Sequence, residues 1–199
     1  MKKFKLTSEF IVDISGVKLF RIKALIEFGN VKAGDLGGYI EKEENLSHMG
    51  NAWVSGNARV SGDARVFGNA QVSGDARVFG NAWVSGNARV FGNAWVSGDA
   101  RVFGNARVFG DARVSGNAQV FGDARVSGDK DYAYAHGFGS CNRTTTFFRL
   151  KDGDVGVRCG CFYGTLAQFR DNVCEMHGET KKAQEYLMLA DLMDFRFKN

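Results

Sequence analysis

The sequence predicts an all-β solenoid, preceded by a β-rich cap and followed by a small α+β module. Three observations predict this fold: thirteen consecutive copies of one hexapeptide fill residues 51–128, Val recurs every six residues within them, and Gly ends each copy. A short fixed period means that each unit stacks on its neighbours and buries one continuous core. We therefore expect domains at 1–48, 49–128 and 129–199.

The first 48 residues have the pattern of a β-rich cap. Apolar runs at Phe10–Val12 and Val17–Ile22 flank Ser15-Gly16, which is typical of a β-hairpin. The segment Gly34-Asp35-Leu36-Gly37-Gly38 predicts a second turn, directly before Tyr39-Ile40.

The repeat unit is [Asn/Asp]-Ala-[Arg/Trp/Gln]-Val-[Ser/Phe]-Gly. Side chains alternate across a strand, so Ala and Val point inward and the residue between them points outward. Small and branched apolar residues inside, with Gly at the bends, indicate a triangular coil. The pattern resembles the left-handed parallel β-helix of hexapeptide-repeat proteins. That resemblance implies a left-handed coil, three hexapeptides per turn and assembly into trimers.

With three units per coil, residues 18 apart in the sequence stack on one another. The outward positions then form three faces, and the sequence order assigns each residue to one of them. The first face carries Trp53, Gln71, Arg89, Arg107 and Arg125; the second Arg59, Arg77, Trp95 and Arg113; the third Arg65, Trp83, Arg101 and Gln119.

Arginine interleaved with aromatic residues can pair with phosphates and stack on bases, so the faces are candidates for binding an anion or a partner. The alternative is that each Arg is solvated or paired with an Asp two residues earlier, as in Asp63 and Arg65. The formal charge of +4 is mild, which makes nucleic acid a weakly supported partner. The candidate ligand or partner residues are Arg59, Arg77, Arg89, Arg107, Arg113, Trp53, Trp83 and Trp95.

Phenylalanine replaces Ser at several corner positions of the repeats. Repeated aromatics on a surface usually mark an interface, so these corners predict a homo-oligomer, either a trimer or a dimer. The expected interface residues are Phe67, Phe91, Phe103, Phe109 and Phe121.

After the repeats, the pattern changes to a ββαα module. Two strands, 144–150 and 155–162, flank the hairpin turn Lys151-Asp152-Gly153-Asp154. Thr165 is a candidate N-cap for a helix that runs to about residue 176, and a second helix is expected over about 180–193.

This module also contains a candidate metal site. Cys159 and Cys161 share one face of a predicted strand, and Cys174 and His177 lie one helical turn apart. Thiolates and imidazole suit zinc, so these four residues predict a structural zinc ion, the one cofactor that the sequence suggests. The alternative is that the cysteines are buried as small hydrophobic residues.

The repeats offer little for catalysis. Many hexapeptide-repeat proteins are acyltransferases that use a His beside a coil as general base, but here the repeats contain no His and no inserted loop. An acyltransferase-like enzyme is therefore the alternative function. It requires His48 or His136 to fall in a cleft between subunits.

The sequence favours a cytoplasmic protein. No run approaches the roughly 18 apolar residues of a membrane span, and the start lacks the apolar segment of a signal peptide. Four Cys without a disulfide-framework spacing fit a reducing compartment.

Two terminal stretches carry a further resemblance. Residues 19–25, 31–40 and 45–47 resemble the opening of bacterial and phage hexapeptide-repeat proteins that are often labelled transferases. Residues 147–178 are similar to a module common in phage-encoded proteins. The resemblance implies a phage-encoded protein in the host cytosol. We expect it to be a non-catalytic, oligomeric binding protein that engages a host protein or sequesters an anionic nucleotide, for instance in counter-defence.

Overall fold

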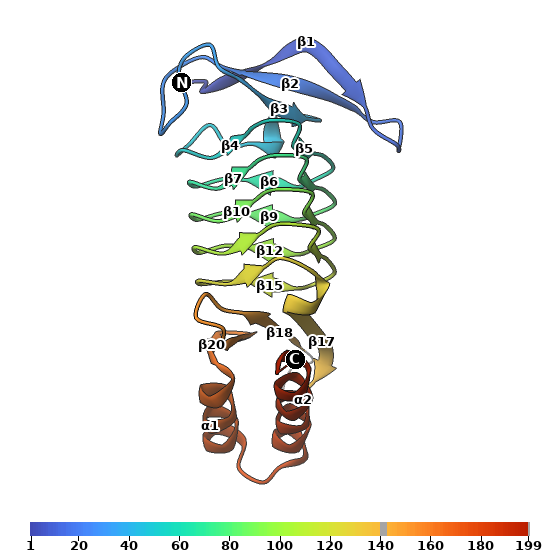
Figure 1. Cartoon of the computed structure of the whole chain (residues 1–199), viewed down its shortest axis with the longest axis vertical. Helices are drawn as coiled ribbons and strands as arrows, with labels where there is room; N and C mark the ends of the chain where they lie inside the picture. Colours follow the sequence, from blue (N-terminus) through green and yellow to red (C-terminus); the bar gives the residue numbers. More distant parts are fainter. Residues whose placement is uncertain (140–142, 199) are drawn as a thin grey trace.

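The protein is an elongated stack of coils closed at both ends (Figure 1). The computed structural model describes residues 1–139 and 143–198. A β-hairpin lies across one end of the stack and projects beyond it at one side, while two helices lie side by side at the other end. Within the described part of the chain, no helix is long and apolar enough to cross a membrane.

The coils are built from two-residue strands, one in each hexapeptide. These strands are β4 Trp53–Val54, β5 Arg59–Val60, β6 Arg65–Val66, β7 Gln71–Val72, β8 Arg77–Val78, β9 Trp83–Val84, β10 Arg89–Val90, β11 Trp95–Val96, β12 Arg101–Val102, β13 Arg107–Val108, β14 Arg113–Val114, β15 Gln119–Val120 and β16 Arg125–Val126. They form three parallel sheets, with the orders β4-β7-β10-β13-β16, β5-β8-β11-β14 and β6-β9-β12-β15.

The predicted 18-residue stacking is confirmed. Arg89 is in register with Gln71 on one side and Arg107 on the other, and Trp95 lies between Arg77 and Arg113. The three faces therefore have the composition that the repeat order predicts, and the solenoid fold is confirmed.

The interior of the coil is a column of Ala and Val. Every repeat Ala and Val, from Ala52 to Val126, has no exposed surface. Burying each Val stabilises the fold by about 1.5–3 kcal/mol. Backbone hydrogen bonds join successive coils, as in Arg89 N–H to Ala106 O (2.9 Å) and Phe91 N–H to Val108 O (3.0 Å).

Gly at the corners is required by the backbone. Gly92 has φ +71°, and a Cβ there would lie 3.1 Å from the amide nitrogen of Gly110 in the next coil. An L-residue at this corner would be strained both by its φ and by the neighbouring backbone.

The N-terminal cap extends one of the coil sheets. β1 (Phe4–Val12) pairs antiparallel with β2 (Lys18–Ala24), β2 with β3 (Leu36–Ile40), and β3 parallel with β5. The predicted hairpin at Ser15-Gly16 is therefore confirmed.

The expected turn at 34–38 is only partly correct, because Gly37 and Gly38 lie inside β3. A Cβ on Gly37 would lie 2.6 Å from the carbonyl oxygen of Val54, and one on Gly38 would lie 2.6 Å from that of Ala58. These glycines let the cap backbone lie directly on the first coil.

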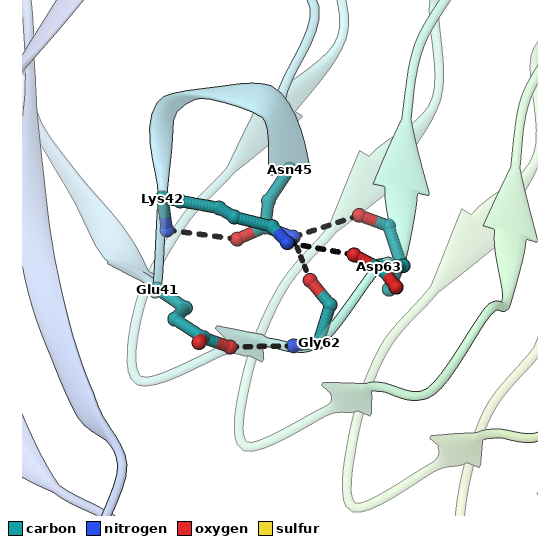
Figure 2. Close-up of polar contacts among 6 residues, drawn as sticks. Glu41, Lys42, Asn45, Gly62 and Asp63 are labelled. Atoms are coloured by element: carbon teal, nitrogen blue, oxygen red, sulfur yellow. Dashed lines mark hydrogen bonds and ion pairs between the residues drawn. The ribbon is translucent and has the colours of Figure 1, made fainter.

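Side chains from the cap also bind carbonyl groups of the first coil that have no backbone partner in a preceding coil. After β3, the short 3-10 helix η1 (Glu43–Asn45) places the Asn45 amide over one corner (Figure 2). Its Nδ2 donates to Gly62 O (3.0 Å) and Ala64 O (2.8 Å), and its Oδ1 accepts from Lys42 N–H (2.9 Å).

Lys3 closes a second corner in the same way. Its Nζ donates to Gly50 O (3.2 Å) and Ala52 O (2.8 Å) and lies 4.6 Å from the ring centre of Phe28. The residue is 1% exposed, and this burial lowers the pKa of its ammonium group to about 8.

The C-terminal module closes the other end of the coil. After the 3-10 helix η2 (Asp129–Asp131), strands β17 (Tyr132–Phe138), β18 (Arg143–Arg149), β19 (Val155–Cys159) and β20 (Phe162–Thr165) form an antiparallel sheet in that order. Helices α1 (Leu166–His177) and α2 (Lys181–Phe197) follow.

The predicted hairpin between β18 and β19 and both helices are confirmed, including the N-cap at Thr165, which accepts from Gln168 N–H (3.3 Å). Strands β17 and β20 are additional to the predicted ββαα order. Phe148 packs into the core of the coil and Phe147 into the core of the module, so β18 joins the two.

Candidate ligand-binding grooves

Most arginines of the coil faces have no carboxylate partner. Among the described residues, no ion pair joins a repeat Arg to a repeat Asp. Asp63 forms its ion pair with Lys42 at 2.7 Å and not with Arg65, which contributes only a smaller, longer-range lowering of the Asp63 pKa.

The other repeat carboxylates form hydrogen bonds with corner Asn side chains of the adjacent coil. Asn57, Asn81, Asn93 and Asn105 each donate to the Asp 18 residues later, at 2.9–3.2 Å. Since each Asp lies at a corner and each Arg at mid-face, the Asp side chains contact the next corner instead. The guanidinium groups are therefore not held by the Asp side chains of the repeats.

The N-terminal cap overhangs all three faces and forms a groove with each. On the β5-β8-β11-β14 face, the projecting hairpin encloses about 470 Å³. The apolar wall of this hairpin groove includes Phe79 and Trp95, and its charged lining is balanced: Arg59 and Arg77 against Asp13 and Glu41.

Trp95 on this face is held between two arginines. The guanidinium carbons of Arg77 and Arg113 lie 5.0 and 5.1 Å from the ring centre of Trp95. Cation–π contacts of this kind occupy both faces of the indole, so no ligand base can stack on it without displacing an arginine.

The groove on the β6-β9-β12-β15 face has a volume of about 600 Å³. Its lining includes Glu43, Glu44 and His48 beside Arg65 and Trp83. A hydrogen bond from Lys2, followed by one from His48, lowers the pKa of the Glu43 carboxyl. With neutral His48 the lining carries a net charge of −1, which disfavours an anion.

The groove on the β4-β7-β10-β13-β16 face differs in charge. We call it the arginine groove; it has a volume of about 690 Å³. Of the described residues that line it, none is acidic and two are arginines, so its charged groups sum to +2. Its lining consists of Gly29, Asn30, Val31, Asn51, Asn69, Gln71, Ser73, Asn87, Arg89, Phe91 and Arg107.

Amide groups supply further donors in the arginine groove. Asn69 Nδ2 donates to Asn87 Oδ1 (3.1 Å), and Asn87 Nδ2 donates to Asn105 Oδ1 (3.2 Å). Each amide nitrogen carries two hydrogens, so one N–H of each side chain remains for a ligand. Arg89 and Arg107 are register partners on neighbouring strands, which places them about 4.8 Å apart along the stack.

Of the two predicted ligand residues Trp53 and Trp83, only Trp83 is exposed. Trp53 is 4% exposed and lies beneath the Phe28 ring, with ring centres 5.4 Å apart, so its assignment to a ligand surface is wrong. Trp83 is 38% exposed and packs against Arg101 (4.9 Å).

The phenylalanine corners are half-buried within one chain. Phe91 stacks on Phe109 with ring centres 5.2 Å apart, and Phe103 packs against Phe121 at 4.5 Å. Phe67 contacts the edge of Trp83. Aromatic neighbours from the adjacent coil therefore cover part of each Phe corner and leave the rest of the ring exposed. Their role in an oligomer remains a prediction.

The four residues of the predicted zinc site are not brought together. Among the described residues, no group of three or more His, Cys, Asp or Glu side chains could hold a metal ion. Cys161 and Cys174 are exposed, while the Cys159 sulfur accepts from Thr145 Oγ1 (3.1 Å). His177 stacks on Tyr186, with ring centres 5.9 Å apart.

The two histidines of the alternative acyltransferase function occupy different ends of the molecule. His48 Nδ1 accepts from Lys3 N–H (3.1 Å), and its Nε2 contacts Glu43 at 2.6 Å. Both ring nitrogens are thus engaged within the cap. His136 lies on β17, where its Nδ1 is 3.0 Å from Thr144 Oγ1.

Sequence reasoning placed Arg89, Arg107 and Gln71 on one face and named Phe91 as an interface residue, but it did not identify the Asn residues or the overhanging turn of the arginine groove. The Asn residues that open each repeat follow from the same 18-residue stacking, so Asn69 and Asn87 could have been found. The overhanging turn at 29–31 could not, because its position depends on how the cap folds over the first coil.

Comparison with known proteins supports the repeat assignment. The family model of the YdcK β-solenoid repeat matches residues 52–68, 58–71, 70–86, 82–98, 100–116 and 106–120. Residues 52–98 and 100–120 of the solenoid are therefore similar to YdcK β-solenoid repeats. A search of curated proteins found no match.

Proposed function

We propose that this protein is a non-catalytic binding protein that holds an anionic ligand in the arginine groove. One observation carries the proposal: Arg89 and Arg107 lie next to each other in a groove whose described lining contains no carboxylate. The other two grooves have balanced or negative linings, so the charge distribution favours this face.

The groups in the groove suit phosphates. Guanidinium donors form short, charge-assisted hydrogen bonds to phosphate oxygens, and two arginines about 4.8 Å apart can bind neighbouring phosphates of one ligand. The volume of about 690 Å³ lies within the range of small-molecule sites, roughly 300–1,000 Å³. The ring of Phe91 at one wall offers a surface for a base.

We therefore propose an anionic nucleotide as the ligand, held without chemical conversion. We further propose that the protein is phage-encoded, acts in the bacterial cytosol and sequesters a nucleotide signal as counter-defence. Support for these steps comes from the resemblance of the terminal modules, and support for the ligand class comes from the charge of the groove.

Calorimetric titration of the purified protein with ATP, a nucleoside monophosphate and a cyclic dinucleotide, without magnesium, tests the proposal. We expect at least one nucleotide to bind, with an affinity that falls as salt is added. The double variant Arg89→Gln/Arg107→Gln should weaken binding about 100-fold, at roughly tenfold for each lost charge-assisted contact.

Arg125→Gln is the matched control, because Arg125 lies on the same sheet but outside the groove. It should bind like the unmodified protein. Equal affinity of the double variant, equal weakening by the control, or no binding of any of the three nucleotides would contradict the proposal.

A further inference from the structure

Helix α2 has an apolar stripe that faces solvent. Met188, Leu192 and Phe195 are 71%, 56% and 72% exposed. They are spaced i, i+4 and i+7 and therefore lie along one side of the helix. We call these three residues the α2 stripe.

The α2 stripe is not the face that packs against the module. That inner face buries Ala183, Tyr186, Ala190, Met193 and Phe197. Helix α2 is thus apolar on two sides, whereas a helix at the surface of a soluble domain usually has one apolar side. Helices α1 and α2 lie at the end of the molecule opposite to the β1–β2 hairpin (Figure 1).

The spacing of the stripe is self-complementary. If two copies of α2 run antiparallel about a point between Asp191 and Leu192, Met188 of each copy faces Phe195 of the other. The two Leu192 side chains then meet at the twofold axis. Thioether–aromatic contacts and an interdigitated Leu pair are favourable at the centre of such an interface.

The charges at the ends of the stripe fit the same arrangement. Glu185 lies three residues before Met188, and Lys198 lies three residues after Phe195. Antiparallel pairing therefore places Glu185 of one copy opposite Lys198 of the other, at both ends. Glu185 Oε2 accepts from Gly139 N–H of its own chain (2.9 Å), so its second carboxylate oxygen is the one left for this pairing. Lys198 bonds to Asp194 of its own helix at 2.7 Å, so it is already held at this end of α2.

The exposed area is sufficient to form the centre of a dimer interface. The three side chains leave on the order of 400 Å² of apolar surface, about half of the ~800 Å² that each partner contributes to a stable interface. Flanking polar residues, among them Lys181 and Gln184, supply the rim. We infer that a second copy of this chain covers the α2 stripe, which makes the protein a dimer joined through α2.

Light scattering coupled to size-exclusion chromatography tests this inference on the full chain. We expect the unmodified protein to be dimeric at micromolar concentration and Leu192→Glu to be monomeric, with a dissociation constant at least 100-fold weaker. Phe195→Ser serves as a second variant, and circular dichroism verifies that each variant is folded.

Two controls separate this interface from others. Met176→Gln changes an exposed Met on α1 outside the stripe, and Phe91→Ser disrupts the stacked corner of the coil; both should remain dimeric. A monomeric unmodified protein, or a folded Leu192→Glu variant that stays dimeric, would overturn the inference. Nucleotide binding in the arginine groove is measured separately, so either result leaves that test independent.

Discussion

Asn45 and Lys3 bind equivalent pairs of backbone carbonyl groups at two corners of the first coil. The Asn45 amide bonds to Gly62 and Ala64, and the Lys3 ammonium bonds to Gly50 and Ala52, which lie two repeats earlier in the sequence. In later coils, backbone N–H groups of the preceding coil fill this position. A neutral and a charged side chain thus perform one role, which is to satisfy the acceptors that the first coil would otherwise bury unpaired.

Replacing Asn45 should destabilise the whole solenoid. Asn45→Ala leaves two buried carbonyl groups and the Lys42 N–H without their partner, and we expect the free energy of unfolding to fall by about 2–4 kcal/mol. Urea denaturation followed by circular dichroism measures the change. Asn57→Ala, which removes an exposed corner amide, is the control and should change stability by less than about 1 kcal/mol.

Lys3 should make stability depend on alkaline pH. Its pKa is about 8 in the folded chain and about 10.4 when unfolded, so between these values the unfolded state binds more protons. The free energy of unfolding therefore rises with pH through this window, as the buried charge is lost.

The measurement compares the unmodified protein with Lys3→Met at pH 7 and pH 9.5. From pH 7 to pH 9.5, the unfolding free energy of the unmodified protein relative to that of Lys3→Met should rise by about 2 kcal/mol. A difference that does not change with pH would show that Lys3 keeps an ordinary pKa.

The corner glycines should tolerate no side chain. Gly92→Ala forces an L-residue to φ +71° and places its Cβ against Gly110, so the free energy of unfolding should fall by about 1–3 kcal/mol. Gly128→Ala provides the contrast, because Gly128 is extended and a Cβ there has nothing within 4 Å. Similar losses for the two variants would refute the account of the corners.

The repeat made much of the fold predictable. A strict period of six fixes which residues are buried and which stack, so the register of Arg89 and Arg107 follows from sequence alone. The roles of Lys3 and Asn45 do not follow, because they depend on where the cap meets the first coil. Trp53 was misassigned for the same reason, since Phe28 covers it.

The C-terminal module was predictable only in part. Turn and capping signals identify the β18–β19 hairpin and both helices. β17 (Tyr132–Phe138) lacks β-branched residues, but its aromatic residues favour a strand, and this signal was missed. The zinc prediction failed because Cys159 packs beneath α2, near Tyr186, while Cys161 and Cys174 face solvent.

Native mass spectrometry of the protein purified from a bacterial cytosol tests the central claim most directly. We predict a bound mass of nucleotide size on the unmodified protein and on Arg125→Gln, and its loss from Arg89→Gln/Arg107→Gln. An adduct that persists in the double variant would place the ligand elsewhere. Protein that stays free of any adduct, even after incubation with the three nucleotides, would contradict the claim that the arginine groove binds an anionic nucleotide.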